Sequence, residues 1–270
     1  MNEIGIMQGR LTNPLHRTDI QFPLYNDREV ANEFEKAKDI GLDYIEWIIS
    51  KGTSNLFFGD FYAIIKSFKE HYVPINSICL DYLMDLAFEN VDLAIATDTI
   101  NWISNISSNI GCKLLIIPIY EKNMNLVINY LISGALDRFQ LNIAFEFLDV
   151  NSYTGINFIN DLNYGNKLKP KRIGCCFDIG NNCGRDIIEE LENYNKHNKL
   201  YHIHIKEKDA NGNSVELNKG VLGYIGWRDI FKFLNKINYS GNFTLQVARG
   251  KAGEEIETIK KQIEFIKALM

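Results

Sequence analysis

Four short segments in the second half of the sequence carry polar side chains at positions where a buried strand would normally carry Val or Ile. The segments read IAFEF, GCCFD, HIHIK and FTLQV. Each alternates in a period of two, which is the pattern of a β-strand whose two faces differ. If these strands are neighbours, two carboxylates, an imidazole and an amide oxygen meet near one level, from Glu146, Asp178, His204 and Gln246.

Such a group of side chains suits one divalent cation. A desolvated carboxylate is costly unless a positive charge balances it, and two carboxylates would neutralise the ion. Oxygen-rich ligation with a single nitrogen favours Mn²⁺, Mg²⁺ or Co²⁺ over a structural Zn²⁺, which prefers thiolates. The alternative is that each residue is a solvated loop residue or a salt-bridge partner. His202 lies roughly 7 Å from His204 along the strand, so we predict His204 as the ligand and His202 as a supporting residue.

Eight apolar or alternating runs along the chain predict the strands that would position these residues. Most of the segments between them have helical periodicity. In residues 26–41 an apolar face follows a capping-box pattern at Asn26 and Glu29, and Gly41 can end the helix. The last helix is predicted from the stripe Ile256, Ile259, Ile263 and Ile266.

The number and spacing of these strand–helix units predict the fold class. Eight units in 270 residues favour a closed α/β (β/α)₈ TIM barrel over an open doubly wound sheet. The sequence contains no G-x-G-x-x-G or Walker motif. No linker or change in composition divides the chain, so we expect one domain over residues 1–270.

The composition limits the classes of partner. The 29 basic and 34 acidic residues give a net charge of −5, which provides no broad cationic field for nucleic acid or an anionic membrane. The five cysteines form no C-x-x-C pair, and the N-terminus has no apolar signal segment. The longest apolar run, LLIIPI, falls far short of the roughly 18 residues that span a bilayer. We therefore expect a soluble cytoplasmic protein.

The chain resembles the xylose-isomerase-like TIM barrels, the group of sugar phosphate isomerases and epimerases. The motifs IGIMQGRL, GLDYIEWI, INSICLDYLMD, IAFEF, FDIGN, HIHIKEKD and FTLQVARG carry the resemblance in this order over essentially the whole chain. The resemblance implies a metal held at the positions of Glu146, Asp178, His204 and Gln246. It also implies a small sugar or sugar phosphate in contact with groups such as Gln8, Arg10 and Asp81.

The sequence departs from the family pattern at two positions. Gln246 stands where the family usually has Glu, and Asn181, which we group with the substrate-binding candidates, stands where it often has His. A glutamine can bind a metal through its carbonyl oxygen, but it cannot accept a proton. Because related 3-epimerases exchange the proton between two metal-bound glutamates, the resemblance favours an isomerase over a 3-epimerase.

The leading hypothesis is metal-assisted aldose–ketose isomerisation through an enediolate, with Glu146 removing the proton next to the carbonyl. Glu46 or Asp81 could supply a second base, and Glu46 could equally pair with an inward arginine such as Arg10. Lys206 and Arg249 could hold a phosphate or stabilise the enediolate, or they could be charges at the rim.

Three competing functions stay open at this point. A dehydratase or a 3-epimerase would begin with the same proton abstraction, and a catalytically degenerate barrel would bind a sugar without converting it. The family that the chain resembles also includes endonuclease IV, whose chemistry needs three zinc ions and more histidines than the five of this chain. We therefore do not expect a nucleic-acid substrate. Barrels of this kind often pair, so a homodimer also stays open.

Overall fold

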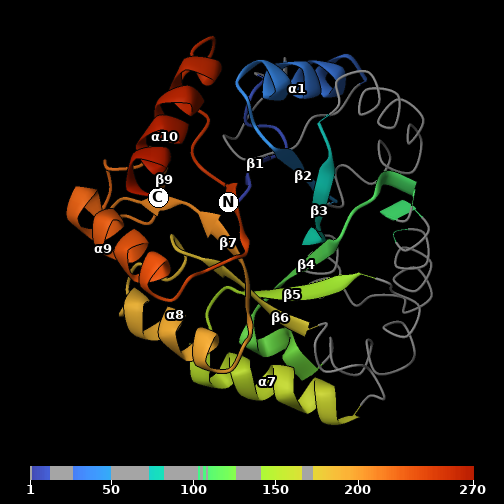
Figure 1. The fold of residues 1–270 in the computed structure, drawn as a ribbon, viewed down its shortest axis with the longest axis vertical. Coiled ribbons are helices and arrows are strands. Elements are labelled where there is room, and N and C mark those ends of the chain that lie inside the picture. The colour runs from blue at the N-terminus through green and yellow to red at the C-terminus, as the bar shows by residue number, and fades with distance from the viewer. Residues whose placement is uncertain are drawn as a thin grey trace.

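Eight parallel strands close into one barrel in the computed structural model (Figure 1). The structure describes residues 2–12, 27–49, 73–81, 103, 106–107, 109–125, 141–165 and 173–270. The order of the strands around the barrel is β1-β10-β7-β6-β5-β4-β3-β2, and β1 also pairs with β2. The strands are β1 (Ile4–Met7), β2 (Tyr44–Ile48), β3 (Ile75–Cys79), β4 (Leu114–Ile119), β5 (Asn142–Phe147), β6 (Ile173–Asp178), β7 (Leu200–Ile205) and β10 (Asn242–Leu245). The predicted (β/α)₈ TIM barrel is confirmed.

Helices surround the strands in Figure 1. Among the described residues they are α1 (Asp27–Asp39), η1 (Glu121–Asn123), α7 (Ser152–Gly165), α8 (Ile187–Lys196), α9 (Gly223–Lys236) and α10 (Glu255–Leu269). A short antiparallel hairpin of β8 (Glu207–Lys208) and β9 (Ser214–Val215) follows β7. None of the described helices is long and apolar enough to cross a membrane.

The predicted first and last helices are confirmed. In α1 the side chains of Phe34 and Ala37 are buried, and Gly41 ends the helix with a φ of +70°. The N–H of Leu42 then donates to the carbonyl of Ala37 at 3.0 Å. Asn26, the predicted cap, lies outside the described residues. In α10 the predicted stripe faces the core, with Ile259, Ile263 and Ile266 buried.

The period of two in the strands divides the core into two parts. Outward-facing residues such as Ile143 and Phe145 pack against the helices in one large cluster. Inward-facing residues form a small second cluster inside the barrel, which contains Met7, Ile48, Cys79, Ile116, Ala144 and Cys176. The remaining inward positions are largely polar, so buried ionisable side chains are concentrated inside the barrel.

Two β-bulges interrupt the regular register of the barrel. Along β2 and β3 the partners step from Ile45↔Ile75 to Glu46↔Ser77, which leaves Asn76 as the extra residue. Along β6 and β7 they step from Cys175↔Leu200 to Cys176↔His202, which leaves Tyr201 as the extra residue. Bulges re-aim side chains and occur often at barrel rims and next to binding sites.

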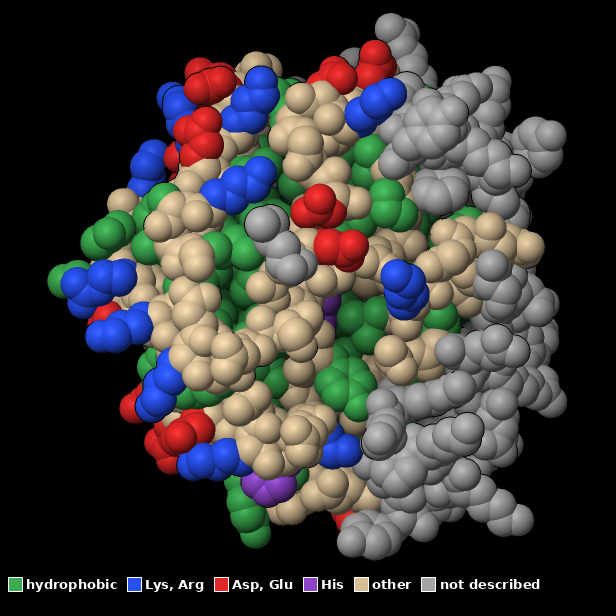
Figure 2. All heavy atoms as spheres, in the orientation of Figure 1, with side chains coloured by type: hydrophobic (Ala, Val, Ile, Leu, Met, Phe, Trp, Pro, Cys, Tyr) green, Lys and Arg blue, Asp and Glu red, His purple; other side chains and the backbone are tan. Residues whose placement is uncertain are grey.

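On the face of the molecule drawn in Figure 2, acidic and basic side chains of the described residues are interspersed.

Candidate metal centre

Three of the four predicted metal ligands lie together at the C-terminal ends of their strands. Glu146 is on β5, Asp178 on β6 and His204 on β7, and each offers one ligand atom within 4.8 Å of the other two. Asp178 and His204 are direct partners in the register of β6 and β7. All three side chains are buried. Neighbouring parallel strands therefore bring two carboxylates and an imidazole to one point.

The hydrogen bonding of these three residues fits a divalent cation. Asp178 Oδ2 and both ring nitrogens of His204 are buried without an aligned hydrogen bond. His204 Nδ1 lies 3.4 Å from Glu146 Oε2, and Lys206 Nζ lies 3.7 Å from Asp178 Oδ2. Because buried polar atoms nearly always have a partner, a carboxylate oxygen and a ring nitrogen left in this way indicate a site for an ion.

Gln246 lies beside this group without joining it directly. It follows β10, where its backbone N–H donates to the carbonyl of Ile205 at 2.9 Å. Its side-chain Oε1 accepts from Lys206 Nζ at 3.4 Å. The buried ammonium of Lys206 therefore lies between Gln246 Oε1 and Asp178 Oδ2. A bound metal would attract the same two oxygen atoms.

Glu46 lies beneath His204 in the barrel interior. Its Oε1 is 2.9 Å from His204 Nε2, and its Oε2 is 3.3 Å from His202 Nε2. Oε2 also accepts hydrogen bonds from the hydroxyls of Ser77 at 2.7 Å and Thr244 at 3.0 Å. Burial alone would raise the pKa of Glu46, but the imidazoles of His204 and His202 hold this pKa well below its ordinary value.

The same contacts set the charge of His204. Burial lowers the pKa of His204, but Cys176 and the carboxylates of Glu46 and Glu146 outweigh burial and raise this pKa well above its ordinary value. Burial raises the pKa of Glu146, which His204 partly opposes. A proton on the imidazole therefore takes the place of a cation in the metal-free protein, and metal binding would release it.

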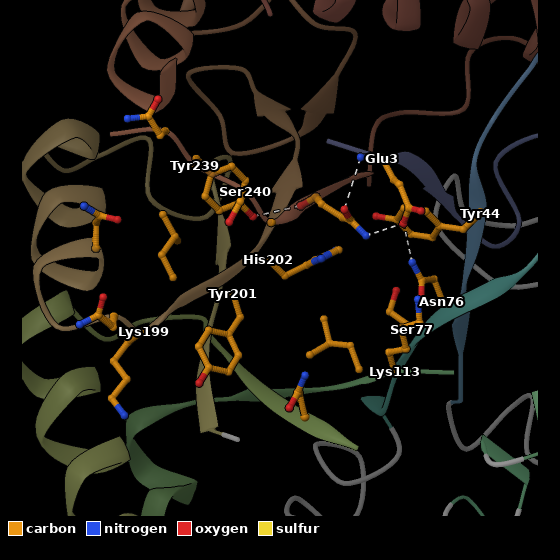
Figure 3. A pocket seen from close by; sticks show the side chains of 18 of the residues that line it. Glu3, Tyr44, Asn76, Ser77, Lys113, Lys199, Tyr201, His202, Tyr239 and Ser240 are labelled. Atoms are coloured by element: carbon orange, nitrogen blue, oxygen red, sulfur yellow. Dashed lines mark hydrogen bonds between the residues drawn. The ribbon is translucent and has the colours of Figure 1, made fainter. Parts of the chain in front are cut away.

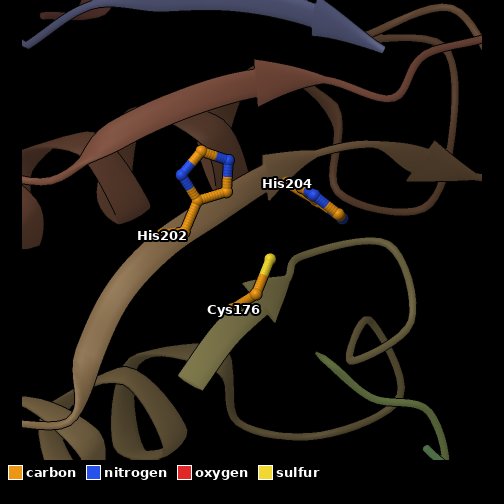
Figure 4. A group of neighbouring side chains, drawn as sticks. All are labelled: Cys176, His202 and His204. Atoms are coloured by element: carbon orange, nitrogen blue, oxygen red, sulfur yellow. The ribbon is translucent and has the colours of Figure 1, made fainter. Parts of the chain in front are cut away.

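A second group of potential ligands lies deeper in the barrel. Figure 4 shows Cys176 of β6 pointing towards the two imidazoles of β7, whose rings are 5.5 Å apart and nearly perpendicular. Cys176, His202 and His204 also offer ligand atoms within 4.8 Å of one another. Burial raises the pKa of the Cys176 thiol to about 12. His204 belongs to both groups, so one ion at a time can use it.

Asn181 connects the two carboxylates of the centre. Its backbone N–H donates to Asp178 Oδ1 at 2.7 Å, and its Nδ2 donates to Glu146 Oε1 at 3.1 Å. Its own Oδ1 accepts from Lys208 Nζ at 2.8 Å. Asn181 therefore helps to orient both carboxylates through Glu146 Oε1 and Asp178 Oδ1.

The other predicted site residues lie at the same end of the barrel. Gln8 Oε1 accepts from the N–H of Ile48 at 3.1 Å, while its Nε2 is buried without a hydrogen bond. Arg10 is buried with Nη2 3.6 Å from Met7 Sδ, and Arg249 is also buried. Asp81, just after β3, is partly buried and accepts from Cys79 Sγ at 3.3 Å.

Glu33 is a buried carboxylate near the site that the sequence prediction missed. Its Oε1 accepts from the N–H groups of Leu11 at 2.8 Å and Thr12 at 3.0 Å, and Arg249 is a nearby positive charge. Burial raises its pKa to about 7. The signal was available in the sequence, because Glu33 lies on the apolar face of the predicted helix between Val30 and Ala37.

Solved structures with the same fold include several proteins that act on sugars or bind a metal. The D-allulose 3-epimerase from Methylomonas sp. superposes with a TM-score of 0.72 at 15% identity, covering 100% of this chain and 98% of that one. The 3-keto-D-glucoside 4-epimerase from E. coli gives 0.68 at 14% identity, over 99% and 100%. The IolI protein, solved with a bound zinc atom, gives 0.69 at 14% identity, over 99% of each chain. At these identities the likeness shows the fold alone.

The comparison with protein families is more specific. No curated protein matches the sequence of the chain significantly. Residues 34–269 match the family model described as the xylose isomerase-like TIM barrel. The match covers most of the chain and includes β2 to β10 of the closed barrel described above. The chain therefore belongs to the xylose isomerase-like TIM barrel family.

Proposed function

We propose that this protein is a metal-dependent isomerase of a small sugar or sugar phosphate. The observation that carries the proposal is the meeting of Glu146, Asp178 and His204 at the end of the barrel where TIM-barrel enzymes place their active sites. The sugars named for two structural neighbours support the substrate class. Gln246 would complete the ligand set through its carbonyl oxygen.

Glu146 would be the base. A bound divalent cation would supply positive charge that polarises the carbonyl and the adjacent hydroxyl of the substrate. Glu146 would take the proton from the hydroxyl-bearing carbon next to the carbonyl, which leaves an enediolate, and would return it to the former carbonyl carbon. The proton of the adjacent hydroxyl passes to the former carbonyl oxygen, so that a new carbonyl forms where the hydroxyl stood. The result is the interconversion of an aldose and a ketose with no change in composition. Asn181 fixes the orientation of the Glu146 carboxylate through its bond to Oε1.

The shortage of a second base favours isomerisation over 3-epimerisation. Gln246 cannot accept a proton. Glu46 is fully buried, with Oε2 bound to two hydroxyls and Oε1 facing His204. A residue held in this way is better suited to orienting His204 than to reaching a substrate. Asp81, which is partly buried at the end of β3, is the remaining candidate for a second base.

The proposed substrate contacts come from the residues around this centre. Gln8 has a buried Nε2 available to a ligand, and Lys206 is a buried cation within 3.7 Å of Asp178. Arg10 and Arg249 add two buried guanidinium groups that suit a phosphate or an enediolate. For the metal, the oxygen-rich ligands favour Mn²⁺, Mg²⁺ or Co²⁺, and the zinc of the IolI structure makes Zn²⁺ the alternative to include.

The test is proton exchange with solvent. The protein is incubated in deuterated water with Mn²⁺ and a panel of ketoses, aldoses and their phosphates, and label uptake is measured by mass. At least one substrate should take up label with the wild type and interconvert. Glu146→Gln should lose this exchange, and Glu192→Gln, at a partly exposed position on α8, is the control that should keep it. Retained exchange in Glu146→Gln would refute the role of this residue as base.

A non-catalytic sugar-binding barrel is the second candidate, because Lys206 supports it. The Lys206 ammonium contacts both Asp178 and Gln246 and could replace a metal as the balancing charge. Such a protein would purify without a stoichiometric divalent ion and would exchange no substrate proton even when Mn²⁺ is added. Measured metal content and the exchange assay together separate it from the isomerase.

A further inference from the structure

A pocket lies at the opposite end of the barrel from the candidate metal centre. It has a volume of about 1100 Å³ and is formed by the N-terminal ends of β3, β4, β5, β7 and β10 (Figure 3). The segments 195–199 and 238–241, which lead into β7 and β10, also line it, together with Glu3, Tyr44 and Lys113. Ligand sites of small molecules are typically of several hundred cubic ångströms, so the space is large enough for a sugar.

The lining of this pocket has the chemistry of a sugar site. Tyrosines 201 and 239 contribute flat apolar rings with a hydroxyl at one end. The side-chain amide of an asparagine both donates and accepts hydrogen bonds, as sugar hydroxyls do. Six asparagines line the pocket, namely Asn76, Asn142, Asn195, Asn198, Asn238 and Asn242.

The two β-bulges of the barrel direct side chains to this pocket. Asn76 and Tyr201 are the extra residues of the bulges, and both line the pocket. The Tyr201 ring lies over the backbone of Gly174, where a Cβ would come within 2.4 Å of the ring. Gly174 therefore leaves the space that the ring occupies. A bulge interrupts the pairing of two strands. Two bulges at one rim of the barrel therefore indicate a role for the side chains that they re-aim.

One wall of the pocket is held in place by its own hydrogen bonds. Glu3 Oε2 accepts from Asn76 Nδ2 and from Asn242 Nδ2, each at 2.7 Å, as the dashed lines of Figure 3 show. Asn242 Oδ1 also accepts from the backbone N–H of Glu3 at 3.3 Å, so both ends of this amide are fixed. Fixed polar groups lose less entropy when a ligand binds.

We propose that this pocket binds a polyhydroxylated ligand of about the size of one sugar ring, at a site separate from the metal centre. The inner end of the pocket reaches the side chain of His202. His202 Nε2 hydrogen-bonds Thr244 Oγ1 at 2.8 Å and lies 3.3 Å from Glu46 Oε2. Lys113 and Lys199 also line the pocket. Their positive charges would favour a phosphorylated ligand over a neutral one.

The experiment follows side-chain amide signals of protein labelled with ¹⁵N-asparagine, assigned by single substitutions. Methyl β-D-glucopyranoside is the neutral probe, because it has no free carbonyl to isomerise, and glucose 6-phosphate is the charged probe. The amide signals of Asn76 and Asn142 should shift in a saturable way with a Kd of about 1 mM or below. Tighter binding of glucose 6-phosphate would assign a phosphorylated ligand, and equal binding a neutral one.

Two blocking variants and one control make the test specific. Asn142 is exposed and its side chain makes no hydrogen bond to the rest of the described chain, so Asn142→Phe should fold and weaken binding at least about tenfold. Ser240→Trp, in the exposed segment before β10, is the second blocking variant. Asn157→Phe is the control, on the exposed face of α7.

Three results would overturn the proposal. The first is the absence of saturable shifts up to about 50 mM of either probe. The second is unchanged binding in folded Asn142→Phe and Ser240→Trp. The third is a shift of the Asn181 amide alone, because Asn181 lies at the metal centre and would report binding at that end of the barrel.

Discussion

Replacing Glu46 by Gln should weaken metal binding although Glu46 is not itself a proposed ligand. Gln has nearly the same shape and can keep hydrogen bonds to the hydroxyls of Ser77 and Thr244. It removes the negative charge that lies 2.9 Å from His204 Nε2. A carboxylate on one ring nitrogen makes the other nitrogen a stronger ligand and fixes its orientation. His204 Nδ1, the nitrogen that faces Glu146, would therefore bind a cation less strongly.

The expected magnitude follows from two opposing effects. Loss of such a supporting carboxylate typically costs about 10- to 100-fold in metal affinity, which is about 1.4 to 2.7 kcal/mol. The same charge also holds a proton on His204, and that proton must leave before a metal binds. Because Coulomb attraction to a divalent ion is about twice that to a proton at the same distance, the loss of metal affinity outweighs the relief from proton competition.

The assay is titration of the metal-free protein with Mn²⁺ by calorimetry at several pH values. Wild-type affinity should rise with pH as the His204 proton is released. Glu46→Gln should bind more weakly throughout, with a smaller loss at low pH and a shallower pH dependence. Glu192→Gln, at a partly exposed position on α8, should behave like the wild type. Equal Mn²⁺ affinity of Glu46→Gln and the wild type above the pKa of His204 would refute the reasoning.

Three further predictions concern other polar positions. Glu207 is buried and accepts hydrogen bonds from three backbone N–H groups and from Trp227 Nε1. Glu207→Gln should therefore lower the free energy of unfolding, measured in urea, by about 2 to 4 kcal/mol. The control Glu216→Gln, at a partly exposed position, should change it by less than about 1 kcal/mol. Burial raises the pKa of Glu33 to about 7, so the folded protein holds this proton more tightly than the unfolded chain does. Relative to Glu33→Gln, the wild type should lose about 2.5 kcal/mol of unfolding free energy between about pH 5 and about pH 8, and no change in this difference would contradict the shifted pKa. Gln246→Glu should strengthen Mn²⁺ binding and introduce 3-epimerisation in the exchange assay, and an inert variant would show that this position does not limit the reaction.

The fold could be predicted from the sequence because its signals are local and repeated. Each strand is an apolar run, and α1 has a capping pattern and a glycine at its end. The period of two then assigns the inward face of each strand. This is enough to bring Glu146, Asp178 and His204 together, since adjacent parallel strands end at the same side of the barrel.

The rest of the site depends on register and on contacts between distant segments, which have no local signal. The position of Glu46 against His202 and His204 requires the closed barrel, because β2 and β7 are not neighbours in it. The bulges at Asn76 and Tyr201 shift the register by one residue, and neither of these two residues is of a type that marks a bulge in the sequence. The pocket at the N-terminal end of the barrel follows from these shifts and could not be predicted.

The pairing of β1 with β10 also determines when the molecule can finish folding on the ribosome. Asn2 Nδ2 donates to the carbonyl of Gly241 at 2.5 Å, across 239 positions of the chain. Until β10 has been synthesised, β1 and β7 each present an unpaired strand edge, which exposes a nascent chain to aggregation. Since Gln246 follows β10 directly, the sealing of the barrel and the completion of the proposed ligand set would be one late event of synthesis.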